Sequence, residues 1–465
     1  MKIKYIDIID QTFNFPQEEF KLDEDTDNVL FHDVPLMELI EEHGTPLKIS
    51  YLPKISQQIN KAKNYFERAF ILNDYKGKYH YSYCTKSSHF SFVLREALKN
   101  DIHIETSSTF DINIIQKMHE EGLFPKDRYV ICNGYKMPSY INKIAELVNG
   151  GFENVLPIFD NYTEVDLLSD KLEEETYCGI RIASEEEPKF EFYTSRLGVG
   201  FKDVVPLFNE KLKNNDKLKL KMLHFFINTG IKDTSYYWSE LLKVVKAYCE
   251  LKKICPSLSA LNIGGGLPIK KSLSFDYNYE YMIEEIVRQI KMYCNKEGVE
   301  EPDIFTEFGS YTVGESGALL LKIVDQKKQN DREKWNMIDS SFMTNLPDAW
   351  ALSQKFVLLA INNWHDEYER ILLGGLTCDS DDYYNSEAHS NAIYLPKFSR
   401  KKPQYIGFFH TGAYQESIGG FGGIHHCLIP QPKHLILDRD KMGNLTQEVF
   451  SEEQTAESMI KLLGY

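Results

Sequence analysis

A single lysine closes a strand-like run in the first quarter of the chain. Lys86 follows Tyr81-Ser82-Tyr83-Cys84-Thr85, at the point where that run ends. A lysine amine enclosed by apolar side chains has a lowered pKa and can form a Schiff base with an aldehyde. A surface amine on an ordinary loop is the alternative, and both interpretations fit this segment.

Three consecutive glycines follow a later apolar run. Leu261-Asn262-Ile263 leads directly into Gly264, Gly265 and Gly266. Without Cβ atoms, such a loop allows backbone N–H groups to approach a phosphate closely. A tight turn between a strand and a helix is the equally weighted alternative.

A carboxylate ends the next apolar run, and small residues follow it. Glu307 is followed by Gly309 and Ser310, which form a second candidate phosphate loop. A carboxylate beside a heterocycle can hold a ring nitrogen protonated through a charge-assisted hydrogen bond. The structural alternative is a solvated acid at the end of a strand.

Two further segments combine reactive and turn-forming residues. Cys378 stands immediately before three acids in Cys378-Asp379-Ser380-Asp381-Asp382, where the thiol could donate a proton and the acids could receive a cationic substrate. Because Asp favours turns, a solvated loop or a cation-binding turn is the alternative. Tyr414, in Gly412-Ala413-Tyr414, is either a phenol that reaches a phosphate or a core side chain.

Alternating short β-rich runs and helical patterns must position these residues. We expect strands at 79–83, 103–104, 129–131, 155–159, 178–182, 222–227, 261–263 and 303–306. Helical spacing occupies 90–98, 110–118, 141–148, 165–172, 238–251 and 281–292. About eight βα repeats predict an α/β protein with a (β/α)8 TIM barrel, whose working loops follow the strand C-terminal ends. An open doubly wound sheet is the competing architecture.

The pattern changes beyond about residue 325. Short strands are expected at 370–376, 392–394 and 405–409, with a weak helix at 348–358 and a final one at 452–463. Short strands separated by turn-rich pieces predict a C-terminal, mostly antiparallel β domain.

Composition limits the partners and the compartment. The 465 residues include 53 basic and 69 acidic ones, and the net charge of −16 repels nucleic acid and anionic membranes. No apolar stretch is long enough to span a membrane and no leader pattern is present, so a cytoplasmic protein is expected. Eight cysteines without a CxxC pair indicate neither a disulfide framework nor a zinc ribbon.

The order of the motifs resembles that of a known family. Lysine, triple glycine, Glu-x-Gly, Cys-Asp and Gly-Ala-Tyr occur in the order found in the pyridoxal-phosphate decarboxylases of the alanine-racemase fold. This group includes ornithine, diaminopimelate and biosynthetic arginine decarboxylases, and the likeness to the arginine enzymes is greatest. Similar segments also lie at 132–136, 346–350, 377–381, 407–409 and 412–416, and the resemblance extends from about residue 45 to 430.

The resemblance implies an architecture, a cofactor and an assembly. It implies a cofactor-binding barrel at residues 45–330 and a β domain made of residues 1–44 and 331–465. Pyridoxal 5'-phosphate is the expected cofactor, with Mg2+ as an additional candidate. A homodimer with active sites shared between subunits is expected, with a higher homo-oligomer as the alternative.

The resemblance also assigns roles to residues. Lys86 matches the Schiff-base lysine, Glu307 the partner of the pyridine nitrogen, and Cys378 a catalytic thiol lent by the neighbouring subunit. The other cofactor-binding residues that it implies are Glu105, Arg181, Phe226, Thr229, Gly264, Gly265, Gly266, Gly309, Ser310 and Tyr414.

Two departures from the family pattern affect cofactor binding. Ser310 stands where the family usually has an arginine after the glycine, so one charge-assisted phosphate contact is missing. Phe226 replaces the histidine that stacks on the cofactor ring, and Thr229 replaces a serine. His224 would share a strand face with Phe226 and is a candidate to compensate.

The implied reaction is the decarboxylation of L-arginine to agmatine and CO2. Asp379 and Asp381 offer carboxylates to a guanidinium, which presents a matching fork of donors. Asp348 is either a further acid of this pocket or a helix N-cap. The alternatives are decarboxylation of ornithine, lysine or diaminopimelate, and a non-catalytic homologue that binds the cofactor as a regulator.

Overall fold

The computed structural model describes residues 7–9, 15, 17–185, 195–330 and 332–465. The chain forms two compact units, each described by itself. The barrel unit contains residues 56–268 and 277–312, and the sheet unit contains residues 1–55, 269–276 and 313–465. The barrel unit begins and ends inside the expected range of 45–330. The reason is that β4 (Leu47–Tyr51), before it, and β13 (Gly317–Lys328), after it, pair with strands of the large sheet in the sheet unit.

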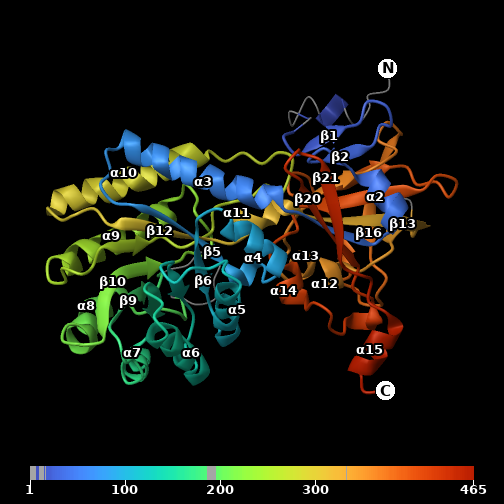
Figure 1. The fold of residues 1–465 in the computed structure, drawn as a ribbon. Helices are drawn as coiled ribbons and strands as arrows, with labels where there is room; N and C mark the ends of the chain where they lie inside the picture. The colour runs from blue at the N-terminus through green and yellow to red at the C-terminus, as the bar shows by residue number, and fades with distance from the viewer. Residues whose placement is uncertain (1–6, 10–14, 16, 186–194, 331) are drawn as a thin grey trace. The chain divides into compact units, whose positions relative to one another are not determined.

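Eight parallel strands close into a barrel, which confirms the predicted TIM-barrel architecture and excludes the open doubly wound sheet (Figure 1). All eight strands lie where the sequence pattern predicts them. They are β5 (Tyr79–Cys84), β6 (His103–Thr106), β7 (Val130–Cys132), β8 (Val155–Phe159), β9 (Thr176–Ile182), β10 (Leu218–Phe225), β11 (Ala260–Asn262) and β12 (Asp303–Phe308).

Helices follow the strands and cover the barrel, and Figure 1 shows α5, α6 and α7 side by side on its outer surface. The helices are α3 (Pro53–Leu72), α4 (Ser91–Leu98), α5 (Thr109–Glu120), α6 (Pro138–Asn149), α7 (Tyr162–Ser169), α8 (Val204–Leu207), α9 (Ser235–Lys252), α10 (Tyr279–Glu297) and α11 (Ser310–Val313). Three of these helices, α3, α8 and α11, were not expected from the sequence pattern.

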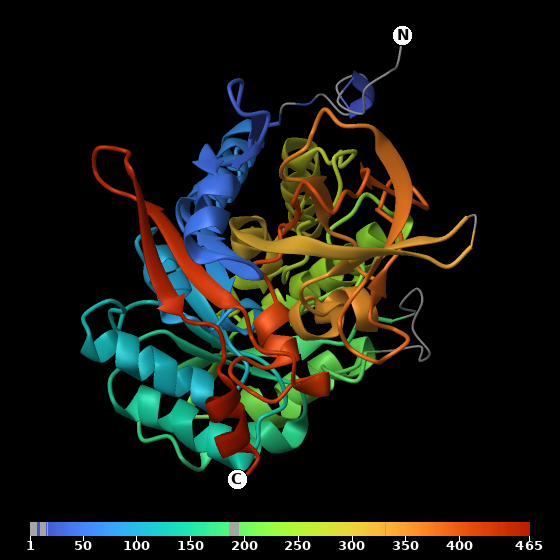
Figure 2. The same ribbon diagram turned by 90° about the vertical axis from the view of Figure 1, so that its right-hand side faces the viewer.

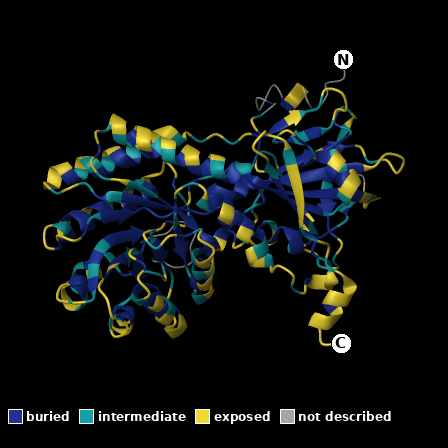
Figure 3. Cartoon of the chain, viewed as in Figure 1, coloured by how far each residue is buried: buried dark blue, intermediate teal, exposed yellow. Residues whose placement is uncertain are grey.

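Local sequence explains where these helices begin and which face they bury. Ser108 and Asn161 cap α5 and α7, since their side chains accept hydrogen bonds from backbone N–H groups three residues later. The barrel strands are mostly buried, whereas the helices alternate between buried and exposed faces (Figure 3). This is the pattern expected of a parallel sheet covered by amphipathic helices.

The sheet unit contains a ten-stranded, mostly antiparallel sheet, as predicted, and a small three-stranded sheet. In the large sheet, β4 pairs antiparallel with β13 and parallel with β20. Figure 2 shows β20 and β21 as a long paired ribbon. The strands are β1 (Phe20–Leu22), β2 (Val29–Phe31), β3 (Val34–Pro35), β4 (Leu47–Tyr51), β13 (Gly317–Lys328), β14 (Lys334–Ile338), β15 (Val357–Ala360), β16 (Tyr368–Gly374), β17 (Tyr383–Tyr384), β18 (Ile393–Pro396), β19 (Gln404–Phe409), β20 (Lys433–Arg439) and β21 (Leu445–Ser451). The helices are α2 (Leu36–His43), α12 (Phe342–Asn345), α13 (Pro347–Ala351), α14 (Gln415–Gly419) and α15 (Ala456–Leu462).

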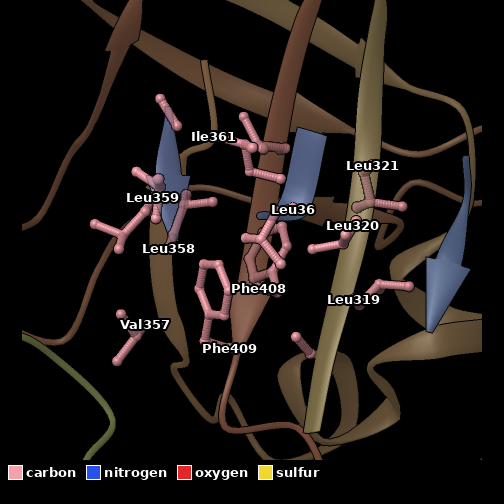
Figure 4. Packing of buried hydrophobic residues seen from close by; sticks show 14 of the residues in the cluster. Leu36, Leu319, Leu320, Leu321, Val357, Leu358, Leu359, Ile361, Phe408 and Phe409 are labelled. Carbon is pink, nitrogen blue, oxygen red and sulfur yellow. The ribbon is translucent and has the colours of Figure 1, made fainter. Parts of the chain in front are cut away.

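A continuous apolar core lies on the large sheet of this unit (Figure 4). Leu358 and Leu319 both stand opposite Phe408, which is fully buried in β19 between them. Burying a side chain of this kind stabilises a fold by roughly 1.5–3 kcal/mol. The core therefore fixes the positions of β13, β15 and β19 relative to one another.

One predicted element is wrong. A helix was expected at 348–358, but α13 ends at Ala351 and the strand β15 begins at Val357. All four residues of β15 are buried, and the strand pairs antiparallel with β19. A short apolar run buried on both faces lacks the alternation that marks a half-buried strand, so periodicity alone cannot separate it from a helix.

Among the residues that the structure describes, every helix is too short or too polar to cross a lipid bilayer.

Candidate active site

The C-terminal ends of the barrel strands bring polar side chains into the barrel unit's interior. Lys86 lies in the short turn η1 (Thr85–Ser87) after β5, and Glu105 lies in β6. Asn133 follows β7 directly, and Glu307 lies near the end of β12. Because β12, β5, β6 and β7 are consecutive neighbours in the barrel, these four side chains converge.

Lys86 is ion-paired with a buried acid. Its Nζ lies 3.2 Å from each carboxylate oxygen of Glu105. The Glu105 side chain is fully buried, whereas 45% of the Lys86 side chain is exposed. The acid thus holds the ammonium group at the barrel mouth, with one side of the lysine accessible to a ligand.

One amide joins two buried carboxylates. Asn133 Nδ2 donates to Glu105 Oε1 at 3.1 Å and to both carboxylate oxygens of Glu307 at 2.9 Å. Burying a carboxylate is costly unless hydrogen bonds or opposite charges compensate. The Asn133 amide therefore allows both acids to occupy the floor of one site.

Two further neutral side chains lie next to the Glu307 carboxylate. Asn262 Nδ2 donates to Glu307 Oε1 at 2.6 Å, and His224 Nε2 lies 3.9 Å from Glu307 Oε2. Burial, followed by the nearby charge of Arg181, lowers the pKa of His224 to about 3, so its imidazole is neutral at physiological pH. In the described part of the chain, the basic side chain within ion-pair distance of this carboxylate is that neutral histidine. A buried anion with neutral donors suits a cationic ligand atom.

The triple-glycine loop packs tightly against two neighbouring strands. A Cβ atom on Gly265 would lie 2.2 Å from the carbonyl oxygen of Glu307, so only glycine fits there. Gly264 has a φ of +70° and donates its N–H to Asn262 Oδ1 at 2.9 Å. In the described part of the chain, the N–H groups of Gly265 and Gly266 have no acceptor. They are therefore available to an anion.

The remaining predicted residues of the barrel unit surround this network. A Cβ on Gly309 would lie 3.0 Å from Ser87 Cβ, so Gly309 packs against the turn that carries Lys86. Ser310 begins α11 and is half-buried. Phe226 follows β10 with 37% of its surface exposed, and Thr229 lies in the next turn. Arg181, in β9, stands opposite His224 in the strand register.

Cys378, Asp379 and Asp381 belong to the sheet unit. Cys378 is exposed in the loop after β16. Asp379 Oδ1 accepts the N–H of Asp381 at 2.8 Å, so the acid closes its own turn. Asp382 is buried and holds the loop, because its carboxylate accepts from Thr377 Oγ1 at 2.7 Å and from the Phe342 N–H at 2.8 Å. The acidic segment thus combines structural and exposed carboxylates.

Asp348 and Tyr414 also belong to the sheet unit. Asp348 is not a helix N-cap: it lies in the first turn of α13, whose N-cap is Leu346. It is buried, and its Oδ2 accepts a hydrogen bond from Gln415 Nε2 at 2.9 Å. Tyr414 is half-buried and has a φ of +69°, at the N-cap of α14.

Sequence reasoning gave no role to the two asparagines that organise the site. Asn133 and Asn262 each interrupt or end an apolar strand, which is the signal that could have identified them. Lys136 was also missed: its side chain is fully buried and its Nζ pairs with Glu164 Oε2 at 3.3 Å. This ion pair anchors the loop that carries Asn133.

Comparison with known proteins identifies the family. Residues 54–314, more than half of the chain, match the family described as "Pyridoxal-dependent decarboxylase, pyridoxal binding domain". The chain belongs to this family. The matched segment includes Lys86, Glu105, Asn133 and Glu307, as well as the glycine loop.

Several known proteins resemble the chain over most of its length. The biosynthetic arginine decarboxylase of Prochlorococcus marinus is 21% identical, over 91% of this chain and 83% of its own. Arginine decarboxylase 2 of Arabidopsis thaliana is 23% identical, over 81% and 68%. The crystal structure of the biosynthetic arginine decarboxylase from Campylobacter jejuni has a TM-score of 0.80 at 18% identity, covering 98% of this chain and 90% of that one. Diaminopimelate decarboxylase from M. jannaschii has a TM-score of 0.79 at 19% identity, covering 96% and 97%. These likenesses to solved structures establish the fold.

The barrel site fits the cofactor of this family. Pyridoxal phosphate carries an aldehyde, a phosphate and a basic ring nitrogen. The site offers the amine of Lys86, the N–H groups of Gly265 and Gly266, and the buried carboxylate of Glu307. Each chemical group of the cofactor therefore has a complementary group in one unit of the chain.

The Asn133 bridge predicts a measurable contribution to folding stability. Asn133→Leu should lower the free energy of unfolding by about 1–3 kcal/mol, because two buried carboxylates lose a shared donor. Urea unfolding followed by fluorescence measures the change. The matched control Asn60→Leu alters an exposed asparagine of α3 and should shift the value by no more than about 0.5 kcal/mol. Equal effects of the two substitutions would contradict the bridge.

The buried His224 predicts a pH dependence of folding stability. The unfolded chain takes up a proton near the ordinary histidine pKa of 6.5, whereas the folded imidazole, which faces Arg181, Lys86, Glu105, Glu307 and Asn262, stays neutral down to about pH 3. Its contribution is complete above pH 6.5 and is lost as the pH falls toward 3.

Replacing the imidazole should therefore reduce the slope. Between pH 6 and 4, the unfolding free energy of the wild type and of His224→Gln should both fall as the pH falls. The slope for His224→Gln should be smaller than that of the wild type by about 1.4 kcal/mol per pH unit. Urea titrations at a series of pH values measure both slopes. Identical slopes would show that His224 takes up its proton in the folded state as readily as in the unfolded chain.

Proposed function

We propose that this protein is a pyridoxal-phosphate-dependent decarboxylase that converts L-arginine to agmatine and CO2. One observation carries the proposal. Lys86 is ion-paired with buried Glu105, which Asn133 joins to buried Glu307, all at the barrel mouth of a pyridoxal-dependent decarboxylase chain. A lysine held against buried acids suits covalent attachment of an aldehyde.

The cofactor would be held by residues of the site already described. Lys86 would bond to it, Glu307 would hold the proton on its ring nitrogen, and Phe226 would pack on its ring. The phosphate would be received by Gly264, Gly265, Gly266, Gly309 and Ser310, with Arg181, Thr229 and Tyr414 as further contacts. When bound, pyridoxal phosphate provides an electron sink for the electron pair left at Cα when CO2 departs.

Glu105 would accept the proton of the Lys86 ammonium group. It lies 3.2 Å from Nζ through both oxygens, so it can accept the proton that the ammonium must lose before the nitrogen acts as a nucleophile. The Asn133 donor offsets part of the negative charge on Glu105, as it does on Glu307. Proton transfer between Lys86 and Glu105 thus stays inside a hydrogen-bonded network.

The sheet unit would provide the proton donor and the substrate contacts. Cys378 would protonate Cα after CO2 leaves, acting as a general acid. Asp379 and Asp381 would receive the guanidinium, since two carboxylates match its fork of donors, and Asp348 would add a further acid. The naming of several relatives as arginine decarboxylases supports this choice of substrate.

We further propose a cytoplasmic homodimer in which Cys378 of each subunit completes the partner's site. Polyamine synthesis is the process that agmatine would enter. A requirement for Mg2+ stays a prediction, which activity measured before and after chelation would test.

A substrate panel tests the proposed reaction. Purified wild-type protein with added cofactor should release CO2 from arginine with a kcat/KM at least about tenfold above that for ornithine, lysine or diaminopimelate, about 1.4 kcal/mol of discrimination. Lys86→Ala should abolish both CO2 release and the visible absorbance of the covalently bound cofactor, because the attachment atom is gone.

A matched lysine variant controls the panel. Lys117→Ala removes an exposed lysine that pairs with Glu120 on α5, and it should keep absorbance and turnover unchanged. If wild-type protein shows no absorbance from bound cofactor, the enzyme proposal fails. Equal turnover of diaminopimelate and arginine would refute the acidic-pocket argument instead.

Mixing two variants with complementary defects tests the shared site. Cys378→Ala should keep the cofactor absorbance yet slow or misdirect protonation of the product, whereas Lys86→Ala should bind no cofactor covalently. An equal mixture should recover roughly a quarter of wild-type turnover, because half the dimers are mixed and each mixed dimer has one intact site of two. A mixture that recovers nothing after subunit exchange would show that each chain uses its own Cys378.

A further inference from the structure

Two of the eight cysteines differ from the rest. Six are buried thiols, whereas Cys378 and Cys427 are exposed. Although they are far apart in the sequence, their Sγ atoms lie 3.4 Å from each other in the sheet unit. His426 completes the group, with its Nε2 3.9 Å from Cys378 Sγ. All three ligand atoms lie within 4.8 Å of one another.

We propose that Cys378, His426 and Cys427 form a binding site for a zinc ion. Two thiolates and one imidazole are the ligand types that Zn2+ takes in proteins. Among the described residues, these three side chains form the group of three or more His, Cys, Asp or Glu residues whose ligand atoms all lie within 4.8 Å of one another. The ligand set is too soft for Mg2+, so the site is distinct from any magnesium requirement.

Two of the three separations between ligand atoms are close to those of tetrahedral coordination. With Zn–S near 2.3 Å and Zn–N near 2.0 Å, tetrahedral angles place two sulfurs about 3.8 Å apart and sulfur and nitrogen about 3.5 Å apart. The observed separations of 3.4 Å and 3.9 Å differ from these values by a few tenths of an ångström. A disulfide would need the sulfurs about 2.0 Å apart, a much larger movement.

Both loops that carry the ligands are anchored by buried side chains. Buried Asp382 fixes the loop of Cys378 through Thr377 and the Phe342 N–H. The buried His425 ring fixes the other loop, since its nitrogens lie 3.0 Å from the Gly420 carbonyl oxygen and 3.3 Å from that of Ile429. The ligands are therefore largely positioned before an ion arrives, which favours binding.

Coordination would remove the thiol that the proposed reaction uses. As each sulfur–zinc bond forms, its thiol releases a proton to solvent, so bound zinc leaves Cys378 without a proton to donate. Zinc would thus inhibit turnover reversibly. This consequence rests on the proposed function, whereas the metal site itself does not.

Metal binding can be measured without activity. Titrating Co2+ into reduced wild-type protein should produce sulfur-to-cobalt charge-transfer absorption with a stoichiometry of one ion per chain, and Zn2+ should displace it. The same signal is expected from Lys86→Ala, which separates the metal site from the proposed reaction. A residue that only supports a metal ligand typically changes metal affinity by roughly 10- to 100-fold when it is replaced. The affinity for Co2+ should fall by more than this in Cys378→Ser, Cys427→Ser and His426→Ala.

The control removes a histidine elsewhere in the sheet unit. His365→Ala removes a hydrogen bond with Asp27 and should leave cobalt binding unchanged. Absence of the charge-transfer band in folded, reduced wild-type protein would overturn the site, as would a band that survives in Cys427→Ser and His426→Ala. If the band appears but Zn2+ does not slow CO2 release from arginine by an otherwise active enzyme, the inhibitory consequence is overturned and the metal site stands.

Discussion

The barrel site depends on keeping two carboxylates buried side by side. Glu105 and Glu307 lie on strands separated only by β5, and the amide of Asn133 donates to both. Lys86 balances one acid, while Asn262 and a neutral His224 support the other. In the proposed reaction this asymmetry would be useful, because one carboxylate would accept the proton of an amine and the second would receive a cation. The buried pair of Lys136 and Glu164 holds the loop that makes this arrangement possible.

Much of the barrel could be predicted because its signal is local. Eight apolar runs alternate with amphipathic segments, and each predicted strand coincides with a real one. The prediction of a helix at 348–358 was wrong because the segment 357–360 is apolar on both faces. This segment is a strand because it pairs with β19, which the local sequence does not show. Long-range hydrogen bonds were also invisible: Asn133 and Glu307 are 174 residues apart, and only the closed barrel brings them together.

The departures from the family motifs fall at positions where the structure offers partial substitutes. Phe226 presents an exposed aromatic face after β10, although its ring cannot ionise as an imidazole can. His224 is buried near Glu307 with a pKa lowered to about 3, so it supports that acid as a neutral neighbour. Ser310 adds no positive charge, which leaves backbone N–H groups of the glycine loop as the main expected phosphate contacts in the described part of the barrel unit.

The path of the polypeptide restricts how this protein can be divided or evolve. The sheet unit takes three separate stretches of sequence, and the barrel unit takes the two stretches between them. Cutting the gene at any point within the barrel unit would therefore separate paired strands: β4 precedes the barrel, whereas its partners β13 and β20 follow it. Exchange of one unit by a single recombination event is thereby disfavoured, and the two units are expected to be inherited together.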